Sequence, residues 1–318
     1  MNFDVVTLGE AMVRLWVGNG ERIETAPALR VSVGGSEANV AIALARTGRK
    51  VSWMSRLPDS YLGKRIANEV RMHGVDLSAV SWSSDGRAGL YFVELSGYPR
   101  EISVLYDRQN SAASQMSISN SNFECLSDCK VFHLSGITPA LSSTTKELCR
   151  EAIKIAKSQK LLVTFDVNYR SALWSVADAR NEISYLASMA SLVVCTSKDA
   201  IELFGFREDE ENLAEKLSTQ FSNPNVIVTH GSSGVSWNLG GHRGSSPAQP
   251  TETVDRLGAG DSFMAGVLLG LLDGNIIGGI NRGQAMAVLK RGIFGDQLLS
   301  SESEVSNLVN GNIVEIRR

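Results

Sequence analysis

The sequence predicts an α/β fold with a mainly parallel central sheet, helices on both faces and a small additional β-sheet. Extended and helical segments alternate through most of the chain, which is the pattern of strand–helix–strand units in a parallel sheet. Strand segments near residues 12–33 and 89–106 break this alternation, so we expect them to form the small sheet. No repeat or linker-like segment divides the 318 residues, which predicts a single domain over residues 1–318.

The first part of the chain supplies six predicted strands and two predicted helices. Each strand is an apolar, β-rich run bounded by turn residues, and each helix is rich in helix formers and ends at glycine. The last two strands flank residues 96–100 and predict a hairpin. The strands are Phe3–Leu8, Met12–Val17, Ala28–Val33, Lys50–Ser55, Gly89–Leu95 and Glu101–Tyr106, and the helices are Ser36–Arg46 and Tyr61–His73.

The second part of the chain alternates more regularly between strands and helices. A strand pair surrounds Gly231 and Gly234, and two helices close the domain. The predicted strands are Val131–Leu134, Leu161–Phe165, Leu192–Thr196, Val226–Thr229 and Val235–Asn238; the predicted helices are Ser142–Ser158, Asp178–Met189, the segment after Asp261, and Ile277–Arg291.

Composition excludes several classes of partner and compartment. Hydrophobic residues make up 43% and charged residues 20% of the chain, as in an average globular protein. Basic and acidic residues number 31 and 34 without a basic block, so neither nucleic acid nor an anionic membrane is expected as a partner. No secretory or membrane-spanning segment is present, which predicts a cytoplasmic protein. Its four cysteines are expected to be reduced thiols rather than disulfides or zinc ligands.

A loop of small residues precedes the longest apolar run of the chain. Gly258-Ala259-Gly260-Asp261 is followed by an uncharged segment that extends to Leu272, which predicts a loop leading into a buried helix. The first amides of such a helix lack intrahelical acceptors and attract anions, and glycine lets a phosphate approach the backbone closely. The alternative interpretation is that Asp261 only caps a glycine-rich turn.

A second glycine pair, Gly34-Gly35, precedes the predicted helix that contains Asn39. Such a pair also presents backbone amides to a ligand, and Asn39, about one turn further on, can both donate and accept hydrogen bonds. A dinucleotide-binding site is the competing interpretation. The spacing is not Gly-x-Gly-x-x-Gly, however, and the pair does not follow the first strand.

Polar residues follow the predicted strand Leu161–Phe165. Extended backbone there would point Asp166, Asn168 and Arg170 to one side. Ligands of open α/β sheets bind beyond the carboxyl ends of the strands, so this segment is a candidate for a ligand site. A solvated loop in which Arg170 pairs with Asp166 is the alternative.

Residues 32–41 and 254–263 resemble the two signatures of the ribokinase-like (PfkB type) carbohydrate kinases. They also follow each other in the family's order along the chain. The resemblance implies a ribokinase-like fold in which the small sheet is a lid over the sugar. It also implies that the amides of Gly258–Gly260 form an anion hole and that Asp261 takes the proton from the sugar hydroxyl. Positioning and charge stabilisation of this kind are most of what phosphoryl transfer requires from a protein.

Further stretches are similar to 2-keto-3-deoxygluconate kinases within that family. They are residues 89–91, 106–108, 133–141, 166–170 and 289–296, so the resemblance spans nearly the whole chain. It implies that the arginines of the sugar site meet the carboxylate of a sugar acid. The residues that it assigns to the sugar side are Gly35, Asn39, Tyr91, Tyr106, Arg108, Ile137 and Arg170.

The resemblance also implies ATP as the phosphoryl donor and Mg²⁺ as its counterion. The family's Asn-x-x-Glu motif is here Thr196-Ser197-Lys198-Asp199, so the amide is lost and Asp199 is left to reach Mg²⁺ through water. A monovalent cation such as K⁺ near Gly258 is implied by the resemblance alone. The residues assigned to the nucleotide side are Thr196, Thr229, Gly231, Gly234 and Asn281.

We therefore expect ATP-dependent phosphorylation of a sugar acid, most specifically 2-keto-3-deoxygluconate at O6. The alternatives are a kinase for a neutral ketose such as fructose, a kinase for another deoxy-keto sugar acid, and a sugar-binding protein of the same fold without activity. The intact Asp261 argues against the last of these. Exposed edges of the small sheet also predict a homodimer.

Overall fold

The computed structural model describes residues 3–96, 100–207 and 211–312. Within them a nine-stranded sheet has the order β13-β12-β11-β10-β9-β8-β1-β4-β5. The strands from β11 to β5 pair in parallel, and β12 and β13 are antiparallel. The strands are β1 (Phe3–Leu8), β4 (Val51–Pro58), β5 (Val80–Ser83), β8 (Cys129–Ser135), β9 (Leu162–Asp166), β10 (Leu192–Thr196), β11 (Asn225–Thr229), β12 (Val235–Leu239) and β13 (His242–Ser246).

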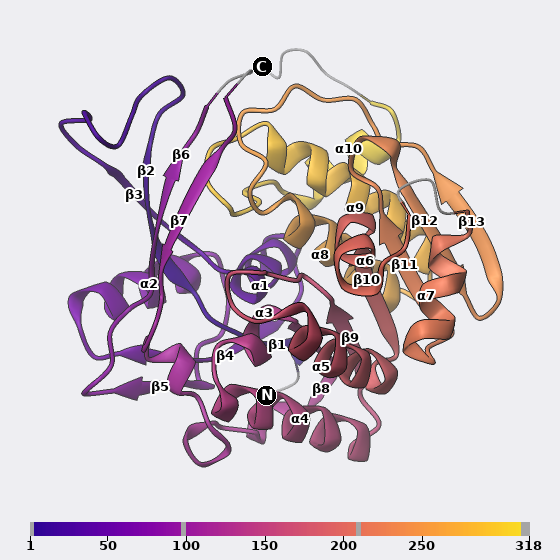
Figure 1. Cartoon of the computed structure of the whole chain (residues 1–318), viewed down its shortest axis with the longest axis horizontal. Helices are drawn as coiled ribbons and strands as arrows, with labels where there is room; N and C mark the ends of the chain where they lie inside the picture. Colours follow the sequence, from indigo (N-terminus) through magenta and orange to yellow (C-terminus); the bar gives the residue numbers. More distant parts are fainter. Residues whose placement is uncertain (1–2, 97–99, 208–210, 313–318) are drawn as a thin grey trace.

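Helices cover both faces of the central sheet (Figure 1). Alternate residues of each strand enter different cores because side chains along a strand point to opposite faces: Val5 packs with one set of helices and Val6 with the other. The first set is α1 (Ser36–Arg46), α2 (Tyr61–Met72), α8 (Ala259–Leu272), α9 (Ile276–Arg291) and α10 (Glu302–Val309); the second is α4 (Ser143–Ser158), α5 (Val176–Met189), α6 (Ser197–Phe204) and α7 (Leu213–Phe221).

Four further strands form a small sheet of order β3-β2-β6-β7. It stands beside the main body, at the upper left of Figure 1. Its own core includes Met12, Trp16, Tyr91, Val93 and Leu95. The strands are β2 (Met12–Val17), β3 (Arg30–Gly34), β6 (Leu90–Glu94) and β7 (Ser103–Asp107).

Glycines allow α8 and α9 to pack with their backbones in contact. A Cβ atom on Gly266 of α8 would lie 2.2 Å from the amide nitrogen of Gly283 in α9, and one on Gly270 would lie 2.3 Å from the Cα of Gly279. No side chain fits at such a distance. This packing holds α8, buried from Asp261 to Gly270, in one position against α9.

The predicted fold class is confirmed, with differences in individual elements. The predicted strand Ala28–Val33 begins two residues later, as β3. Six elements were not predicted from the sequence: β5, α3 (Ile137–Ala140), α6, α7, β13 and α10. Of these, β13 (His-Arg-Gly-Ser-Ser) lacks apolar alternation and is a strand because it pairs with β12, while α10 is mostly polar.

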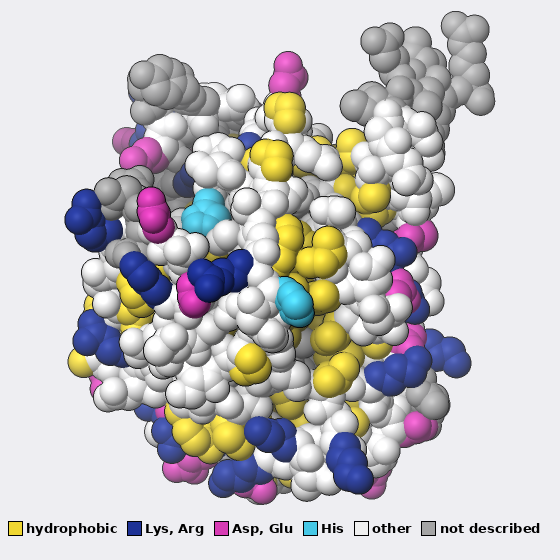
Figure 2. Space-filling model, turned by 90° about the vertical axis from the view of Figure 1, so that its right-hand side faces the viewer, with side chains coloured by type: hydrophobic (Ala, Val, Ile, Leu, Met, Phe, Trp, Pro, Cys, Tyr) yellow, Lys and Arg dark blue, Asp and Glu magenta, His cyan; other side chains and the backbone are white. Residues whose placement is uncertain are grey.

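On one face of the molecule, charged side chains of both signs are mixed. Figure 2 shows the face that carries β12, β13 and α7, where Lys and Arg side chains are interspersed with Asp and Glu. In the described part of the chain, none of the helices combines the length and the apolar character that crossing a membrane would require.

Candidate active site

The N-terminus of α8 is shaped by Gly258. This residue has φ 79°, in the left-handed region, and a Cβ atom on it would lie 1.8 Å from the carbonyl oxygen of Asp296. Glycine is therefore required at this position on two grounds. Ser262 N donates to Gly258 O at 3.0 Å, so the amides before it lie at the partially positive end of the helix; of these, Ala259 N donates to Arg256 O at 3.3 Å.

Asp261, in the first turn of α8, is buried and held by two donors from α1. Its Oδ1 accepts from Ser36 Oγ at 2.7 Å, and its Oδ2 accepts from Asn39 Nδ2 at 2.7 Å. Burial raises the pKa of the Asp261 carboxyl, while the two hydrogen bonds and the charge of Arg170 oppose the increase. The result is an oriented carboxylate that is a stronger base than an exposed aspartate.

The glycine pair before α1 brings Ser36 and Asn39 to Asp261. A Cβ atom on Gly35 would lie 2.1 Å from Glu10 O, and one on Gly34 would lie 2.1 Å from the Tyr91 hydroxyl. The pair therefore lets α1 begin against the turn that follows β1. Ser36 was not identified from the sequence, although its place directly after the glycine pair was a usable signal.

A cavity of about 90 Å³ lies between the small sheet and the main body. It brings together all seven residues that the sequence analysis assigned to the sugar side. It also contains Gly258 and Asp261 of the loop and several residues that were not anticipated. Its lining is Glu10, Met12, Gly34, Gly35, Ser36, Asn39, Tyr91, Tyr106, Arg108, Ile137, Arg170, Leu257, Gly258, Asp261 and Asp296.

Arg108 enters this cavity already paired with an acid. Its Nε and Nη2 donate to Glu10 Oε2 at 2.8 and 2.5 Å, and Ser111 Oγ donates to Glu10 Oε1. Both residues of the pair are almost completely buried. Glu10 was not predicted from the sequence, although only Gly9 separates it from β1 and it therefore lies just beyond the carboxyl end of that strand.

Arg170 differs from Arg108 in having no acidic partner within 4 Å among the described residues. Its Nη1 donates to Tyr169 O at 2.9 Å, and its side chain is exposed at the cavity. Arg170 does not form the surface ion pair with Asp166 that was the alternative interpretation. Asp166 is buried and accepts a hydrogen bond from Asn168 Nδ2 instead. Arg170 is thus the arginine of this cavity without a direct acidic partner in the described structure, although its charge acts on Asp166, Asp199 and Asp261.

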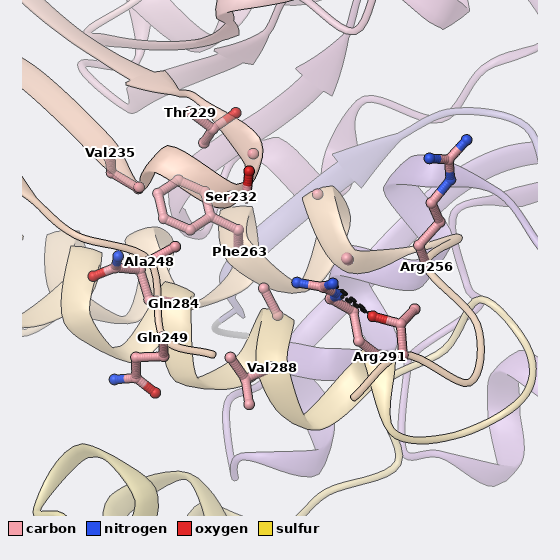
Figure 3. A pocket seen from close by; sticks show the side chains of 16 residues that line it. Thr229, Ser232, Val235, Ala248, Gln249, Arg256, Phe263, Gln284, Val288 and Arg291 are labelled. Carbon is pink, nitrogen blue, oxygen red and sulfur yellow. Dashed lines mark hydrogen bonds between the residues drawn. The ribbon is translucent and has the colours of Figure 1, made fainter. Parts of the chain in front are cut away.

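A second cavity, of about 550 Å³, lies on the other side of the α8 N-terminus and is shown in Figure 3. The Phe263 ring and Val288 give it apolar surface. The predicted Thr229, Gly231 and Gly234 line it. Its full lining is Thr229, Gly231, Ser232, Gly234, Val235, Ala248, Gln249, Thr253, Arg256, Ala259, Gly260, Phe263, Gln284, Ala287, Val288 and Arg291.

Two predicted nucleotide residues lie outside this lining. Asn281 is exposed on α9, about one turn before Gln284, which does line the cavity. Thr196 caps α6, its Oγ1 accepting from Asp199 N at 3.0 Å. Their assignment to the nucleotide stays a prediction.

Asp166 and Asp199 form a buried acidic pair at the carboxyl ends of β9 and β10. Burial raises the pKa of both carboxyls; nearby Asp261 and Asp199 raise that of Asp166 further, and Arg170 opposes both increases. Asp199 Oδ2 is buried without a hydrogen-bond partner in the described structure. No group of three His, Cys, Asp or Glu side chains in the described ranges is arranged to hold a metal by itself.

The chain is similar to carbohydrate kinases over almost its whole length. The model of the pfkB family carbohydrate kinases matches residues 2–302. A 2-dehydro-3-deoxygalactonokinase of Haloferax volcanii is 37% identical over 100% of both chains. A 2-dehydro-3-deoxygluconokinase of Bacillus subtilis is 29% identical over 93% of this chain and 92% of its own. The crystal structure of a 2-dehydro-3-deoxygluconokinase from Thermotoga maritima, 30% identical, superposes with a TM-score of 0.91 over 98% of this chain and 99% of that one.

Proposed function

Because this chain belongs to the pfkB family of carbohydrate kinases and is a sugar kinase, we propose that it transfers the γ-phosphate of ATP to a 2-keto-3-deoxy sugar acid. The preferred acceptor is 2-keto-3-deoxygluconate, phosphorylated at O6. The observation that carries the proposal is the position of the α8 N-terminus between two cavities. Gly258 and Asp261 face the smaller one, and Ala259 and Gly260 face the larger.

In this proposal the larger cavity holds ATP and the smaller one holds the sugar acid. Asp261 accepts the proton of the O6 hydroxyl as the oxygen attacks the γ-phosphorus, and ADP leaves. The amides of Gly258–Gly260 stabilise the charge on the phosphoryl oxygens, since they lie at the open end of α8. Together these groups supply the positioning, the base and the charge stabilisation that the reaction needs.

The pairing of the two arginines in the smaller cavity favours an acidic substrate. Arg108 is paired directly with Glu10, whereas Arg170 has no acid within 4 Å in the described structure, although its charge acts on Asp166, Asp199 and Asp261. A carboxylate can accept a charge-assisted bond from the Arg170 guanidinium, and a neutral ketose cannot. We therefore assign the carboxylate of the sugar acid primarily to Arg170.

Magnesium fits the acidic pair of Asp166 and Asp199. Both are buried carboxylates. Asp199 Oδ2 has no hydrogen-bond partner in the described structure, so it can accept a bond from a water or bind a metal ion. Mg²⁺ prefers oxygen ligands, keeps several waters and is usually shared between one or two carboxylates and nucleotide phosphates. Bound there, it would neutralise phosphate charge, and the two aspartates would hold its water shell.

One specific observation favours a second acceptor. The relative that is 37% identical over its full length is named for the galactonate epimer rather than for the gluconate. The two acids share the carboxylate and the terminal hydroxyl and differ at one carbon, so Arg170 and Asp261 serve either of them in the same way. 2-Keto-3-deoxygalactonate is therefore the second candidate.

The small sheet is proposed to act as a lid and to join two subunits. Tyr91, Tyr106 and Arg108 reach the smaller cavity from β6, β7 and the residue after β7, so closing this sheet would exclude water from the transfer. Its edge strands β3 and β7 expose Val31 and Leu105. An exposed apolar edge of this kind favours pairing with a second copy of the chain.

The proposal is tested by ADP release with a panel of acceptors. We expect kcat/KM for the two keto acids to exceed that for fructose, and Asp261→Asn to lower kcat by roughly 10² to 10⁴ while ATP binding is retained. Asp273→Asn, at the other end of the same helix, is the matched control and should keep its activity. More than about half of the wild-type rate in Asp261→Asn would exclude a general-base role.

Arg170→Lys separates acidic from neutral acceptors. It should raise KM for the keto acids about tenfold or more, the size of a lost hydrogen bond to a charged group, and leave any fructose turnover unchanged. Arg180→Lys is the control, because Arg180 donates to Leu203 O and is not part of the cavity lining. Equal effects on both classes of acceptor, or a higher kcat/KM for fructose, would reject the sugar-acid assignment.

A further inference from the structure

A buried lysine lies beside the loop where the family resemblance implied a monovalent cation. Lys290, near the end of α9, has no exposed surface. Its ammonium donates to Asp255 O at 2.8 Å and to Ile293 O at 3.3 Å. Both acceptors are backbone carbonyl oxygens, and the ammonium that they bind is fully buried. Carbonyl oxygens are also ligands of K⁺.

Lys290 already occupies the place between these carbonyls where a free cation would bind. The acids whose charges act on it are Asp255, Asp296 and Asp261. Asp255 and Asp296 also pair with Arg14 of the small sheet, at 2.6 and 2.5 Å. A further cation at the two carbonyl oxygens would lie against the ammonium group, and like charges at that distance repel each other.

This group of residues supports the segment that leads into Gly258. Asp255 Oδ1 accepts from Leu257 N at 3.0 Å, and its Oδ2 accepts from Gly295 N at 3.1 Å. Through Asp255 O, Lys290 connects the end of α9 to the same segment. The position of the Gly258–Gly260 amides thus depends on a cation that belongs to the chain.

We propose that Lys290 is a positioning residue whose ammonium replaces a bound monovalent cation, so that this kinase works without K⁺. The inference rests on the proposed function in taking the Gly258–Gly260 amides as the anion hole. A covalently attached ammonium holds the loop at every salt composition, whereas a bound ion would hold it only above its dissociation constant.

The first test uses the wild-type enzyme. ADP release with 2-keto-3-deoxygluconate is measured in tetramethylammonium chloride and in KCl at equal ionic strength. The two rates should agree within about twofold, which is smaller than the rate loss caused by removing one charge-stabilising donor. An increase of about tenfold with K⁺ overturns the proposal. Activity in neither salt with any sugar acid counts against the proposed function instead.

A binding measurement keeps the two proposals separable. Thermal unfolding of the wild-type protein is followed while K⁺ is titrated against tetramethylammonium, without sugar or ATP. We expect no K⁺-specific increase in Tm, because a ligand that binds the native state would stabilise it. A saturable K⁺-specific increase would contradict the inference even if the protein had another substrate.

Two variants of Lys290 provide the sharper test. Lys290→Ala leaves space beside Asp255 O and Ile293 O; it should lose about tenfold or more in kcat and regain several-fold with K⁺ or NH₄⁺ but not with Li⁺ or choline. Lys290→Met fills the same space with an apolar chain, so it should lose activity without rescue. Lys154→Met, on the exposed face of α4, controls for removal of a lysine.

Rescue that is equal for all cations, or full activity of Lys290→Ala without K⁺, would show that Lys290 is merely structural. Circular dichroism of each variant checks that it is folded. If neither variant folds, the two wild-type measurements still decide the question.

Discussion

Asp261 illustrates how much a single residue depends on its hydrogen-bond partners. Both of its carboxylate oxygens accept from α1, yet a carboxylate has about four lone-pair sites, so it can still receive a proton from a sugar hydroxyl. The two donors also stabilise its charged form and so limit the increase in pKa that burial causes. Ser36 and Asn39 therefore set the pH range in which the base is available.

Removing one donor should shift the pH profile in a defined direction. In Ser36→Ala the charged form of Asp261 loses a hydrogen bond, so its pKa rises and the acid limb of kcat/KM moves to higher pH, on the order of one unit. The measurement is the pH dependence of ADP release. Ser52→Ala, a buried serine of β4 whose Oγ faces Asp76, is the control. An acid limb that stays in place or moves to lower pH would contradict this role for Ser36.

Among the elements, β8 and β9 show a polar pair inside the core of the central sheet. His133 of β8 is opposite Thr164 of β9, and its Nδ1 lies 3.0 Å from Thr164 Oγ1. Burial lowers the pKa of His133 from 6.5 to about 3, and its Nε2 has no partner in the described structure. The neutral imidazole is accommodated between the strands, but the imidazolium is not.

This buried histidine should make the protein less stable in mild acid. The unfolded chain takes up the proton below pH 6.5 and the folded chain only near pH 3, so stability falls as the pH drops below 6.5. Between pH 7 and pH 5 the loss should be about 2 kcal/mol. Urea unfolding of the wild type and of His133→Leu at both pH values measures it.

The variant should lack this part of the pH dependence, whatever its stability at pH 7. His242→Leu, an exposed histidine of β13, should keep the wild-type pH dependence. A pH dependence that is the same in His133→Leu and in the wild type would show that His133 is not the group responsible.

For the whole molecule, the relation between the small sheet and the main body decides how the active site closes. Arg14 of β2 joins the two parts by its ion pairs with Asp255 and Asp296, which lie near the N-terminus of α8. The same sheet exposes apolar residues at its edges. One side of the sheet thus lines the smaller cavity, and its edges are exposed. In the proposed function this sheet closes over the sugar, and its edges pair with another subunit.

Charge placed on an edge strand should dissociate the proposed dimer. Leu105 of β7 is 67% exposed, and Leu105→Lys is expected to shift the sedimenting species from twice the chain mass to the chain mass. Ile118→Lys, 47% exposed and outside the small sheet, is the matched control and should remain dimeric. A wild-type protein that sediments as a fully active monomer would remove the dimer from the proposal.

The sequence by itself determined the fold class and selected Asp261, whose role as the base stays a prediction. The alternation of strands and helices is a local sequence pattern. Residues 258–261 predict an anion-binding helix N-terminus, because glycine permits the positive φ at that position and an acid is stabilised in the first turn of a helix. The seven residues assigned to the sugar side meet in one cavity. They were selected through resemblance to a family, since nothing in their local sequence indicates that they meet, and their contact with a sugar stays a prediction.

Only the tertiary structure decided which charges neutralise each other. Arg108 pairs with Glu10 across 98 positions of the chain, and Arg14 pairs with Asp255 across 241. Lys290 is an ordinary charged residue at a helix end until the fold buries its ammonium against Asp255 O. Such pairings depend on burial and distance, which local patterns do not encode. In the two proposals, these pairings determine which arginine meets the substrate and whether a bound cation is needed.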